Sequence, residues 1–458
     1  MHEPEKLVDF LRSEPLDAFL QLEALRDERG RISRAQKAFG PMASFALEQL
    51  HVRSKAVAKA PYLYRSGWLF TQRSLEQCTS EAVARVKSLW LRGSSFTDLT
   101  TGAGVDAFFA SRAGMPLFLA EQDPLLRSML VHNFRNDENN LNIVADGMAY
   151  VKSTPCPESA PKEGGPILFD HAEMVDANDS MSRHSIGSVA YLDPDRRPGG
   201  RRTYSWHDSL PNVIVLMPRL MSSFDSVWVK SSPMTDPTES MRAWDGHTTD
   251  VFAICWQGEL KELLFRVQRW KSDDCRLHAV YIYEHDPCAT TFAIQGQMTT
   301  NRTNEGGPPP FHLFTRSLFE STTSPIYPSV AKQGDLLFEP HAGLKRLNLS
   351  TQYAAAMGYT QMAPHIPYFL VKSEHTTRQN QVPGRLFRIR DVLQYQPKTL
   401  VRQLKLMGIS RAMMASKGFF LSVAQLRSTL NIPDGADAYL IFTTLAGRKP
   451  VCIVADLL

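Results

Sequence analysis

The spacing of apolar residues changes along the chain and divides it into regions of different predicted structure. Over residues 1–60 apolar positions recur every three or four residues, as in Leu7, Phe10 and Leu11, which predicts a run of helices. Residues 71–90 predict one further helix. From residue 94 onward short apolar strands alternate with helical segments. This alternation is typical of a parallel sheet with helices on both of its faces.

The alternating region begins with three strands that each end at or beside an acidic residue: Asp98, Glu121 and Asp146. Further strands are expected at 188–195, 222–233, 251–256, 259–267 and 277–285, and a strand followed by a helix is expected at 211–220. Residues 152–187 are rich in Pro, Gly, Ser and Asp, so they predict a long insertion with little regular structure. Beyond residue 285 the alternation fades, which predicts a new domain.

Composition and charge add a second division. The chain of 458 residues has a net charge of +4, but residues 383–458 alone carry +7 and the remainder −3. A basic module beside a near-neutral body is typical of a protein that binds a polyanion, although a solvated surface explains the charge equally well. No apolar run reaches the length of a membrane span, and the acidic N-terminus does not resemble a signal peptide. Scattered cysteines and histidines without ligand spacing predict a cytoplasmic protein without a metal.

The segment Asp98-Leu-Thr-Thr-Gly-Ala-Gly-Val-Asp-Ala carries the clearest chemical signal. Gly102 and Gly104 permit a tight turn between a strand and a helix, where backbone N–H groups point at a ligand. The glycines alone do not separate NAD from S-adenosylmethionine. Asp98 favours the latter, because its carboxylate would face an ammonium group that NAD lacks. Glu121 is placed to bind ribose hydroxyls, and Asp146 to accept the adenine amino group.

The segment Tyr191-Leu-Asp-Pro-Asp-Arg-Arg ends the fourth strand and would lie beside that ligand. Asp193 and Pro194 are the candidate catalytic residues, because they can orient a substrate amine or receive its proton. Arg196 and Arg197 are candidate phosphate contacts, or they pair with Asp195. Lys230, at another strand end, is a further candidate substrate contact. The sequence Glu259-Leu-Lys-Glu262 is interpreted as the capped start of a helix.

Several motifs together resemble one known family, the bacterial class I S-adenosylmethionine-dependent methyltransferases that carry a C-terminal THUMP-like domain. The resemblance rests on motifs in a fixed order along the chain: Leu75-Glu-Gln with Glu81, Ala84 and Lys87, DLTTGAGVDAFF, the Glu121 region with His132-Asn-Phe, YLDPDRR, Val229-Lys-Ser-Ser-Pro-Met, Gly258-Glu-Leu-Lys-Glu, Phe338-Glu-Pro, Pro383-Gly-Arg, and Phe420-Leu-Ser through Gly435-Ala-Asp. The ordered set is more specific than any single motif.

The resemblance implies an α/β fold with a seven-stranded Rossmann-like methyltransferase core. The implied domains are N-terminal helices at 1–65, the methyltransferase domain at 66–285, a ferredoxin-like α+β domain at 286–382 and a THUMP-like, RNA-binding domain at 383–458. Carried over by position, the cofactor would be bound by Asp98, Thr100, Gly102, Gly104, Glu121 and Asp146, with Asp193 and Pro194 at the acceptor. Family members that methylate amino groups usually continue this motif with a second proline and an aromatic residue. Here Asp195 and Arg196 stand in those positions, so stacking of an aromatic ring on a target base is not expected.

The sequence therefore predicts an S-adenosylmethionine-dependent methyltransferase that acts on an RNA nucleotide, in tRNA or rRNA. One alternative is an RNA-binding or adaptor protein with a degenerate methyltransferase core. A second is a methyltransferase with a substrate other than RNA, and a third is a nicotinamide-dependent oxidoreductase. The methylated atom and the oligomeric state are left open.

Overall fold

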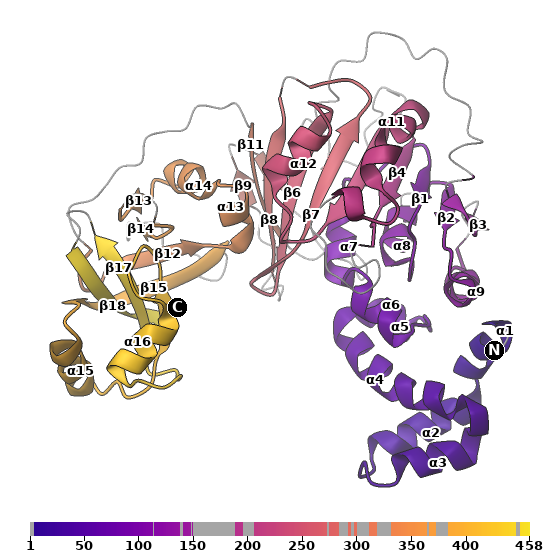
Figure 1. The fold of residues 1–458 in the computed structure, drawn as a ribbon, viewed down its shortest axis with the longest axis horizontal. Coiled ribbons are helices and arrows are strands. Elements are labelled where there is room, and N and C mark those ends of the chain that lie inside the picture. The colour runs from indigo at the N-terminus through magenta and orange to yellow at the C-terminus, as the bar shows by residue number, and fades with distance from the viewer. Residues whose placement is uncertain are drawn as a thin grey trace. The chain divides into compact units, whose positions relative to one another are not determined.

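The computed structural model describes residues 4–112, 114–137, 141–147, 149, 188–195, 206–272, 274–283, 292–294, 297–299, 311–317, 331–363, 366–371, 383–445 and 449–458. The chain forms two compact units (Figure 1). The first comprises Met1–Phe252, Glu262–Cys275 and Glu284–Phe311. The second comprises Ala253–Lys261, Arg276–Tyr283 and His312–Leu458. Within the described residues, no helix combines the length and the apolar character that a membrane crossing requires.

The helices predicted for residues 1–60 are present. They are α1 (Pro4–Leu11), α2 (Glu14–Ala24), α3 (Arg31–Phe39), the short 3-10 helix η1 (Gly40–Met42) and α4 (Ala43–Lys59), followed by α5 (Pro61–Arg65). The apolar stripe of α1 and α2, including Leu7 and Leu16, is buried in their common core. Glu23 of α2 is completely buried, and Arg34 of α3 donates to both of its carboxylate oxygens, at 2.6 and 2.7 Å.

The single helix predicted for residues 71–90 is wrong, because the chain breaks there into α6 (Gln72–Gln77) and α7 (Glu81–Lys87). Cys78 and Ser80 have extended backbone angles, and Thr79 between them is buried. The Thr79 hydroxyl donates to Asp106 Oδ2 at 2.7 Å. Thr and Ser compete poorly for helix interiors, and a buried side-chain partner for Thr79 favours the break.

The sheet of the first unit confirms the predicted alternation of strands and helices. In sequence order its strands are β1 (Phe96–Asp98), β2 (Leu117–Ala120), β3 (Leu141–Val144), β4 (Val189–Leu192), β5 (Ser226–Ser231), β6 (Thr248–Trp256) and β7 (Glu259–Gln268). Among these described strands the spatial order is β6-β7-β5-β4-β1-β2-β3. Strands β5, β4, β1, β2 and β3 are parallel to one another, and β7 is antiparallel to β5.

Helices α8 (Val105–Ser111), α9 (Pro124–Asn133), α11 (Val213–Ser223) and α12 (Pro237–Ala243) accompany this sheet, with the 3-10 helix η3 (Trp206–Asp208). All residues of β1 and β4 are buried, as expected for a parallel sheet that is covered on both faces. Two local expectations are wrong. Residues 213–223 are helical and the described residues 206–212 before them contain no strand. Glu259 begins a strand rather than a helix, which confirms the strand predicted for 259–267.

The second unit contains β8 (Arg276–Ile282) and β11 (Phe311–Ser317), which are neighbours, and a further sheet. The strands of that sheet are β12 (Leu336–Pro340), β13 (Thr360–Gln361), β14 (Phe369–Val371), β15 (Gly384–Gln394), β16 (Met413–Ser416), β17 (Tyr439–Leu445) and β18 (Lys449–Leu457). Their spatial order, within the described part of the chain, is β13-β14-β12-β15-β18-β17-β16. The helices are α13 (Ala342–Arg346), α14 (Ser350–Ala356), α15 (Pro397–Leu406) and α16 (Val423–Leu430), and β9 (Phe292–Ile294) pairs with β10 (Gln297–Thr299) in the first unit.

Strands β12 and β15 bring two of the motifs together. Glu339 lies opposite Arg385 in the antiparallel register, and the Arg385 guanidinium donates to the buried Glu339 carboxylate at 2.5 and 2.9 Å. Gly384 permits this contact, because a Cβ atom there would lie 2.2 Å from the Glu339 carbonyl oxygen. The division at residues 65, 285 and 382 stays a prediction, and residues on both sides of the 382 boundary share this strand pair.

Candidate active site

The turn after β1 is built by a chain of backbone hydrogen bonds. The amide of Thr101 donates to the carbonyl of Ala120 on β2, and the amide of Leu99 donates to that of Tyr191 on β4, each at 3.0 Å. Gly104 begins α8 with φ of +79°, a left-handed conformation that favours glycine. A Cβ atom at this position would lie 2.6 Å from Leu130 Cδ2 of α9. Gly104 therefore serves both the turn and close helix packing.

Glu121, directly after β2, holds the turn from the other side. Its Oε2 accepts a hydrogen bond from the amide of Gly102 at 2.8 Å, and its Oε1 accepts one from the amide of Asp123 at 2.8 Å. Each carboxylate oxygen has a second lone pair that remains for a ligand hydroxyl. Space is open beside Gly102, where an added Cβ atom would meet nothing within 4 Å. Glu121 and Gly102 are therefore joined directly by a hydrogen bond.

Asp98 is the most unusual charged group of the turn. The side chain is buried, and Oδ1 accepts one hydrogen bond, from the amide of Thr100 at 3.0 Å. Burial raises the pKa of the Asp98 carboxyl well above its ordinary value; the Thr100 amide opposes this increase, and the carboxylates of Asp106, Asp193 and Glu121 add to it. Within the described ranges no Lys or Arg side chain forms an ion pair with Asp98. A cationic ligand group would supply the missing partner.

Asp146 follows β3 and is exposed, and its Oδ1 accepts a hydrogen bond from the amide of Ala149 at 3.2 Å. The carboxyl ends of β1, β2 and β3 lie at the same edge of the parallel sheet, so Asp98, Glu121 and Asp146 share that edge. This is the edge at which open α/β sheets bind ligands. The assignment of Asp146 to an adenine amino group stays a prediction.

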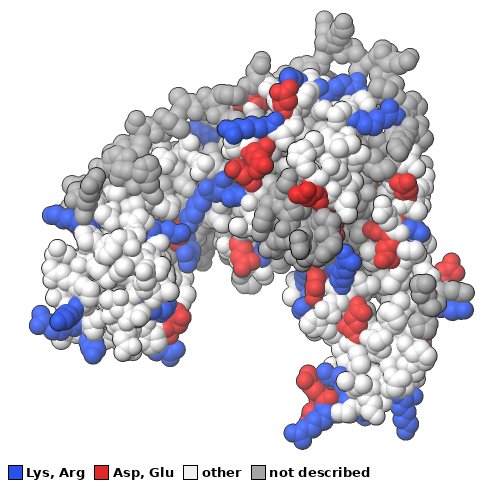
Figure 2. All heavy atoms as spheres, viewed as in Figure 1, with Lys and Arg blue, Asp and Glu red and all other residues white. Residues whose placement is uncertain are grey.

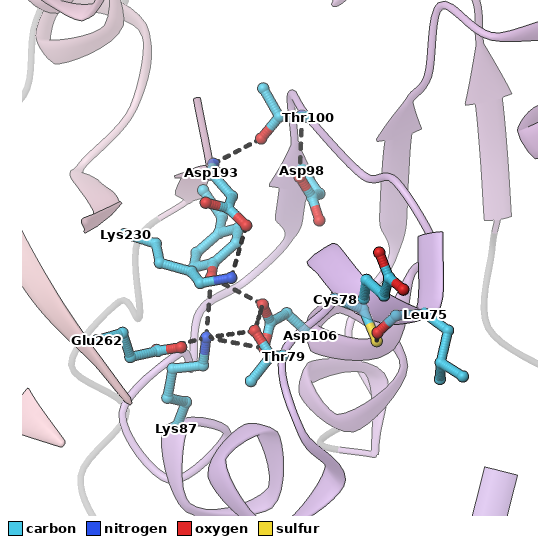
Figure 3. Close-up of polar contacts among 12 residues, drawn as sticks. Leu75, Cys78, Thr79, Lys87, Asp98, Thr100, Asp106, Asp193, Lys230 and Glu262 are labelled. Carbon is cyan, nitrogen blue, oxygen red and sulfur yellow. Dashed lines mark hydrogen bonds and ion pairs between the residues drawn. The ribbon is translucent and has the colours of Figure 1, made fainter. Parts of the chain in front are cut away.

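The segment after β4 approaches the turn directly. The amide of Asp193 donates to Thr100 Oγ1 at 2.6 Å, which joins the two segments beside Asp98 (Figure 3). The Oδ2 atom of Asp193 accepts a hydrogen bond from Lys230 Nζ of β5 at 2.6 Å. Burial by itself would lower the pKa of Lys230, but Asp193, Glu262 and Asp106 outweigh it and raise that pKa above its ordinary value. Lys230 therefore contacts a candidate catalytic residue.

A layer of buried charges lies beneath these residues. Lys87 of α7 is fully buried, and its Nζ lies 2.9 Å from Asp106 Oδ1 of α8 and 2.8 Å from Glu262 Oε1 of β7. The Lys87 ammonium also donates to the Tyr191 hydroxyl at 3.0 Å, and that hydroxyl donates to Asp106 Oδ2 at 2.8 Å. Burial tends to raise the pKa of Asp106, but the charges of Lys87 and Lys230 and the hydrogen bonds from Lys87 and Thr79 outweigh it and lower that pKa. Helices α7 and α8 are thereby tied to strands β4 and β7.

This layer was missed by the sequence analysis. The sequence predicts Lys87 only as part of a motif. Glu262 falls both in the strand predicted for 259–267, which the structure confirms, and at a predicted helix start, which is wrong. Nothing in the local sequence pairs Lys87 with Glu262, since the two residues are distant along the chain.

Two candidate substrate contacts, Arg196 and Arg197, lie outside the described residues, as does the predicted insertion at 152–187. Asp195 is described, and its carboxylate lies 3.7 Å from the exposed guanidinium of Arg73 on α6. Among the described side chains, no group of three or more His, Cys, Asp and Glu is arranged to hold a metal ion.

The residues present fit S-adenosylmethionine. Among the described side chains the buried Asp98 carboxylate has no cationic partner, and the ligand's ammonium group would provide one. The ribose hydroxyls match the free lone pairs of Glu121, and the open backbone at Gly102 admits a ligand to van der Waals contact. This fit is judged only from the charged and hydrogen-bonding groups that Asp98, Glu121 and Gly102 offer.

The second unit carries a basic surface on α15. Residues 392–433 contain six Lys and Arg and no acidic residue. Lys398, Arg402 and Lys405 are exposed, and their spacing of four and three residues places them on one face of α15. Figure 2 shows cationic side chains gathered where Figure 1 draws α15. We call these three residues the α15 surface.

An exposed aromatic ring lies next to this surface. Phe420 is 67% exposed and stacks on Phe419, with ring centroids 4.5 Å apart. Tyr395, two residues before α15 begins, contacts both rings edge-on. The Phe419–Phe420 pair therefore lies near the N-terminal end of α15.

Comparison with known proteins identifies the second unit's last segment and the fold. Residues 384–456 match a family model described as THUMP domain-like. The whole chain shares its fold with a solved putative methyltransferase of Porphyromonas gingivalis, at a TM-score of 0.68 and 20% identity over 96% of this chain and 97% of that one. The predicted α/β methyltransferase-like fold with a C-terminal THUMP-like domain is confirmed.

Two curated relatives, from two strains of Mycobacterium tuberculosis, are named uncharacterized S-adenosylmethionine-dependent methyltransferases. Each is 25% identical to this chain over 228 residues, which is 49% of this chain and 54% of the relative. This chain therefore spans about half the length of the curated relatives it matches.

Proposed function

We propose that this protein is a methyltransferase that uses S-adenosylmethionine to methylate a nucleotide of RNA, in the cytoplasm. The observation that most directly supports this cofactor is the buried Asp98 carboxylate, which has no cationic partner among the described side chains. A ligand ammonium at this position turns an unfavourable buried charge into an ion pair. NAD has no such group.

The residues present need to perform little covalent chemistry. S-adenosylmethionine, when bound, supplies a methyl group that is already activated on a sulfonium. Asp98 and Glu121 bind and orient the ligand, with the amides of the β1–α8 turn beside them. Asp193, held beside the turn through Thr100, orients the acceptor and receives its proton. Pro194 restricts the backbone that aims Asp193.

RNA as the substrate is supported by the THUMP-like domain's exposed chemistry. The α15 surface presents cations without neighbouring acids in the sequence, which suits a phosphate backbone. Phe420 presents a ring face on which an unpaired base can stack. Arg196 and Arg197 stay predicted phosphate contacts.

Isothermal titration calorimetry of the full chain with S-adenosylmethionine, S-adenosylhomocysteine and NAD tests the cofactor proposal. We expect saturable binding of both adenosyl ligands, weakened by about 1–3 kcal/mol in Asp98→Ala and in Glu121→Ala, since each leaves polar partners unsatisfied. Glu259→Ala, in an exposed ion pair with Lys261, is the matched control and should bind normally. Binding of NAD alone, or of none of the three, would refute the proposal.

Transfer of a tritiated methyl group to bulk bacterial RNA tests the acceptor. Labelled RNA that depends on intact Asp193 is the expected result. Cofactor binding with RNA binding but no transfer would instead identify an RNA-binding protein with an inactive core. Transfer to protein or small molecules, unaffected by Lys405→Glu on the α15 surface, would identify a substrate other than RNA.

A further inference from the structure

We infer that Lys230 is a positioning residue: it holds the Asp193 carboxylate by Oδ2 and leaves Oδ1 to receive the proton of the methyl acceptor. This inference rests on the proposed function, because it assigns a task to a residue of the same site. It replaces the expectation that Lys230 contacts the substrate.

The first argument is the geometry of the pair. Lys230 Nζ lies 2.6 Å from Asp193 Oδ2, and the Lys230 side chain is only 12% exposed, whereas that of Asp193 is 33% exposed. The lysine is thus the more buried member of the pair, and Figure 3 shows Asp193 joined both to Lys230 and to Thr100. Within the described residues Oδ1 of Asp193 has no hydrogen bond. A buried charge-assisted bond of this length defines which oxygen is presented.

The second argument is the way in which Lys230 is itself held. It extends from β5 toward the buried layer, where Glu262 and Asp106 act on it electrostatically and are in turn bound by Lys87. Asp193 is fixed at its backbone by Thr100 and at its side chain by Lys230. One attachment comes from the turn after β1 and the other from β5, so both the backbone and the carboxylate of Asp193 are held. A general base that acts within hydrogen-bonding reach requires such positioning.

The third argument is charge. The ionisable groups that act on Asp193 from the elements around it are Asp98 of β1, Tyr191 of β4, Lys230 of β5 and Cys78 after α6. Lys230 is the cation in this set, and its Nζ contacts Asp193 Oδ2. Replacing Lys230 by a neutral residue would therefore remove the positive charge that contacts this carboxylate.

The step balances without a further reactant. The acceptor nitrogen or oxygen uses its lone pair to form a bond to the methyl carbon, and the carbon–sulfur bond breaks with its electron pair remaining on sulfur. The proton on the acceptor passes to Asp193 Oδ1 and then to solvent. Lys230 remains protonated throughout.

The first experiment needs no RNA. Full-length protein is labelled with ¹³Cγ-aspartate, the resonance absent from Asp193→Asn is assigned to Asp193, and it is followed by NMR between pH 4 and 8. In Lys230→Met the midpoint of the titration should rise by about one pH unit or more, as expected when a close opposite charge is removed. Lys230→Arg should restore the wild-type midpoint. Lys261→Met breaks the ion pair between Lys261 and Glu259 of β7, away from the site, and should leave the Asp193 midpoint unchanged.

The second experiment measures transfer to bulk bacterial RNA at saturating S-adenosylmethionine. Lys230→Met should lower kcat by about tenfold or more and shift the acid limb of the pH profile upward, with cofactor Kd within about twofold of wild type. Lys230→Arg should recover most of kcat. Circular dichroism verifies folding; if Lys230→Met does not fold, Lys230→Gln takes its place in both experiments.

An unchanged Asp193 midpoint in Lys230→Met, or equal losses of kcat in the Met and Arg variants, would overturn the inference. Failure of the proposed function has a different signature. In that case the wild-type protein itself binds no adenosyl ligand or transfers no methyl group, whatever the NMR titration of Asp193 shows.

Discussion

The candidate active site and the α15 surface use charge in opposite ways. In the site, Lys87, Asp106, Glu262 and Asp98 are all buried. Lys87 forms ion pairs with Asp106 and Glu262, whereas Asp98 has no cationic partner among the described side chains. On α15 the cations are exposed and lie in a stretch without acids. Buried charges interact strongly and fix geometry, whereas exposed charges act additively and are screened by salt. Single substitutions should therefore have large, specific effects in the site and small, cumulative effects on the surface.

The largest effect is expected for Lys87→Met. This change leaves Asp106 and Glu262 buried without their cation, and breaking a buried pair in this way costs about 3–5 kcal/mol of unfolding free energy. Urea unfolding followed by circular dichroism measures it. Lys261→Met removes a more exposed partner of Glu259 and should cost about 1 kcal/mol or less. Equal losses of unfolding free energy in the two variants would contradict the expected difference between buried and exposed ion pairs.

Asp98→Asn should separate stability from binding. The folded-state pKa of Asp98 is raised, so ionisation of this residue opposes folding as pH rises through that pKa. Without ligand, the variant should melt at a higher temperature than wild type at neutral pH, and this advantage should vanish at low pH. Affinity for S-adenosylmethionine should nevertheless fall by about 1–3 kcal/mol. A variant that is less stable at neutral pH would indicate a purely structural carboxylate.

Phe420→Ala tests whether the exposed aromatic ring next to the α15 surface contributes to RNA binding. Loss of one stacking platform should weaken binding of a single-stranded RNA by about 1–3 kcal/mol, measured by fluorescence anisotropy. Phe420→Trp preserves the ring face and should bind as wild type. If both variants bind normally, the exposed ring does not contact RNA.

The raised pKa of Asp98 also predicts that the cofactor binds with release of a proton. A carboxyl that is partly protonated in the free protein ionises when it meets an ammonium group, so affinity should rise with pH by at most about 1.4 kcal/mol per pH unit. Calorimetry in buffers with different ionisation enthalpies measures the released proton. Asp98→Asn should release none, and a wild-type signal equal to that of the variant would exclude Asp98 as the source.

The smallest effect is expected for Lys405→Ala. Removal of one phosphate contact should reduce the slope of log affinity against log salt by about 1 and weaken all RNA sequences alike. Lys271→Ala, which alters an exposed cation paired with Asp245 in the first unit, should leave the slope unchanged. A normal slope in Lys405→Ala would place the phosphate contacts elsewhere.

The sequence was sufficient for elements whose signals are local. The strand–glycine turn–helix around Asp98 to Gly104 follows from residue spacing, and the place of Glu121 beside it follows from the edge rule of parallel sheets. The hydrogen bond from the Gly102 amide to Glu121 is not predicted by the sequence. The break between α6 and α7 was not predictable from its own residues, because Thr79 is directed by Asp106, which is 27 residues away. Lys230 was recognised as a strand-end residue, but its partner depends on how β4 and β5 pair. Such long-range pairings are properties of the packed fold.

The pairing of β12 with β15 has a practical consequence for how this protein can be divided. A fragment that starts at residue 383 would expose one edge of β15 over the stretch that β12 covers, with unpaired N–H and C=O groups open to association with other chains. Conversely, a truncation that removes residues 383–458 would expose β12 and leave the buried Glu339 without Arg385. Excision at the apparent family boundary therefore damages both pieces, and a fragment intended to fold alone should begin before Leu336.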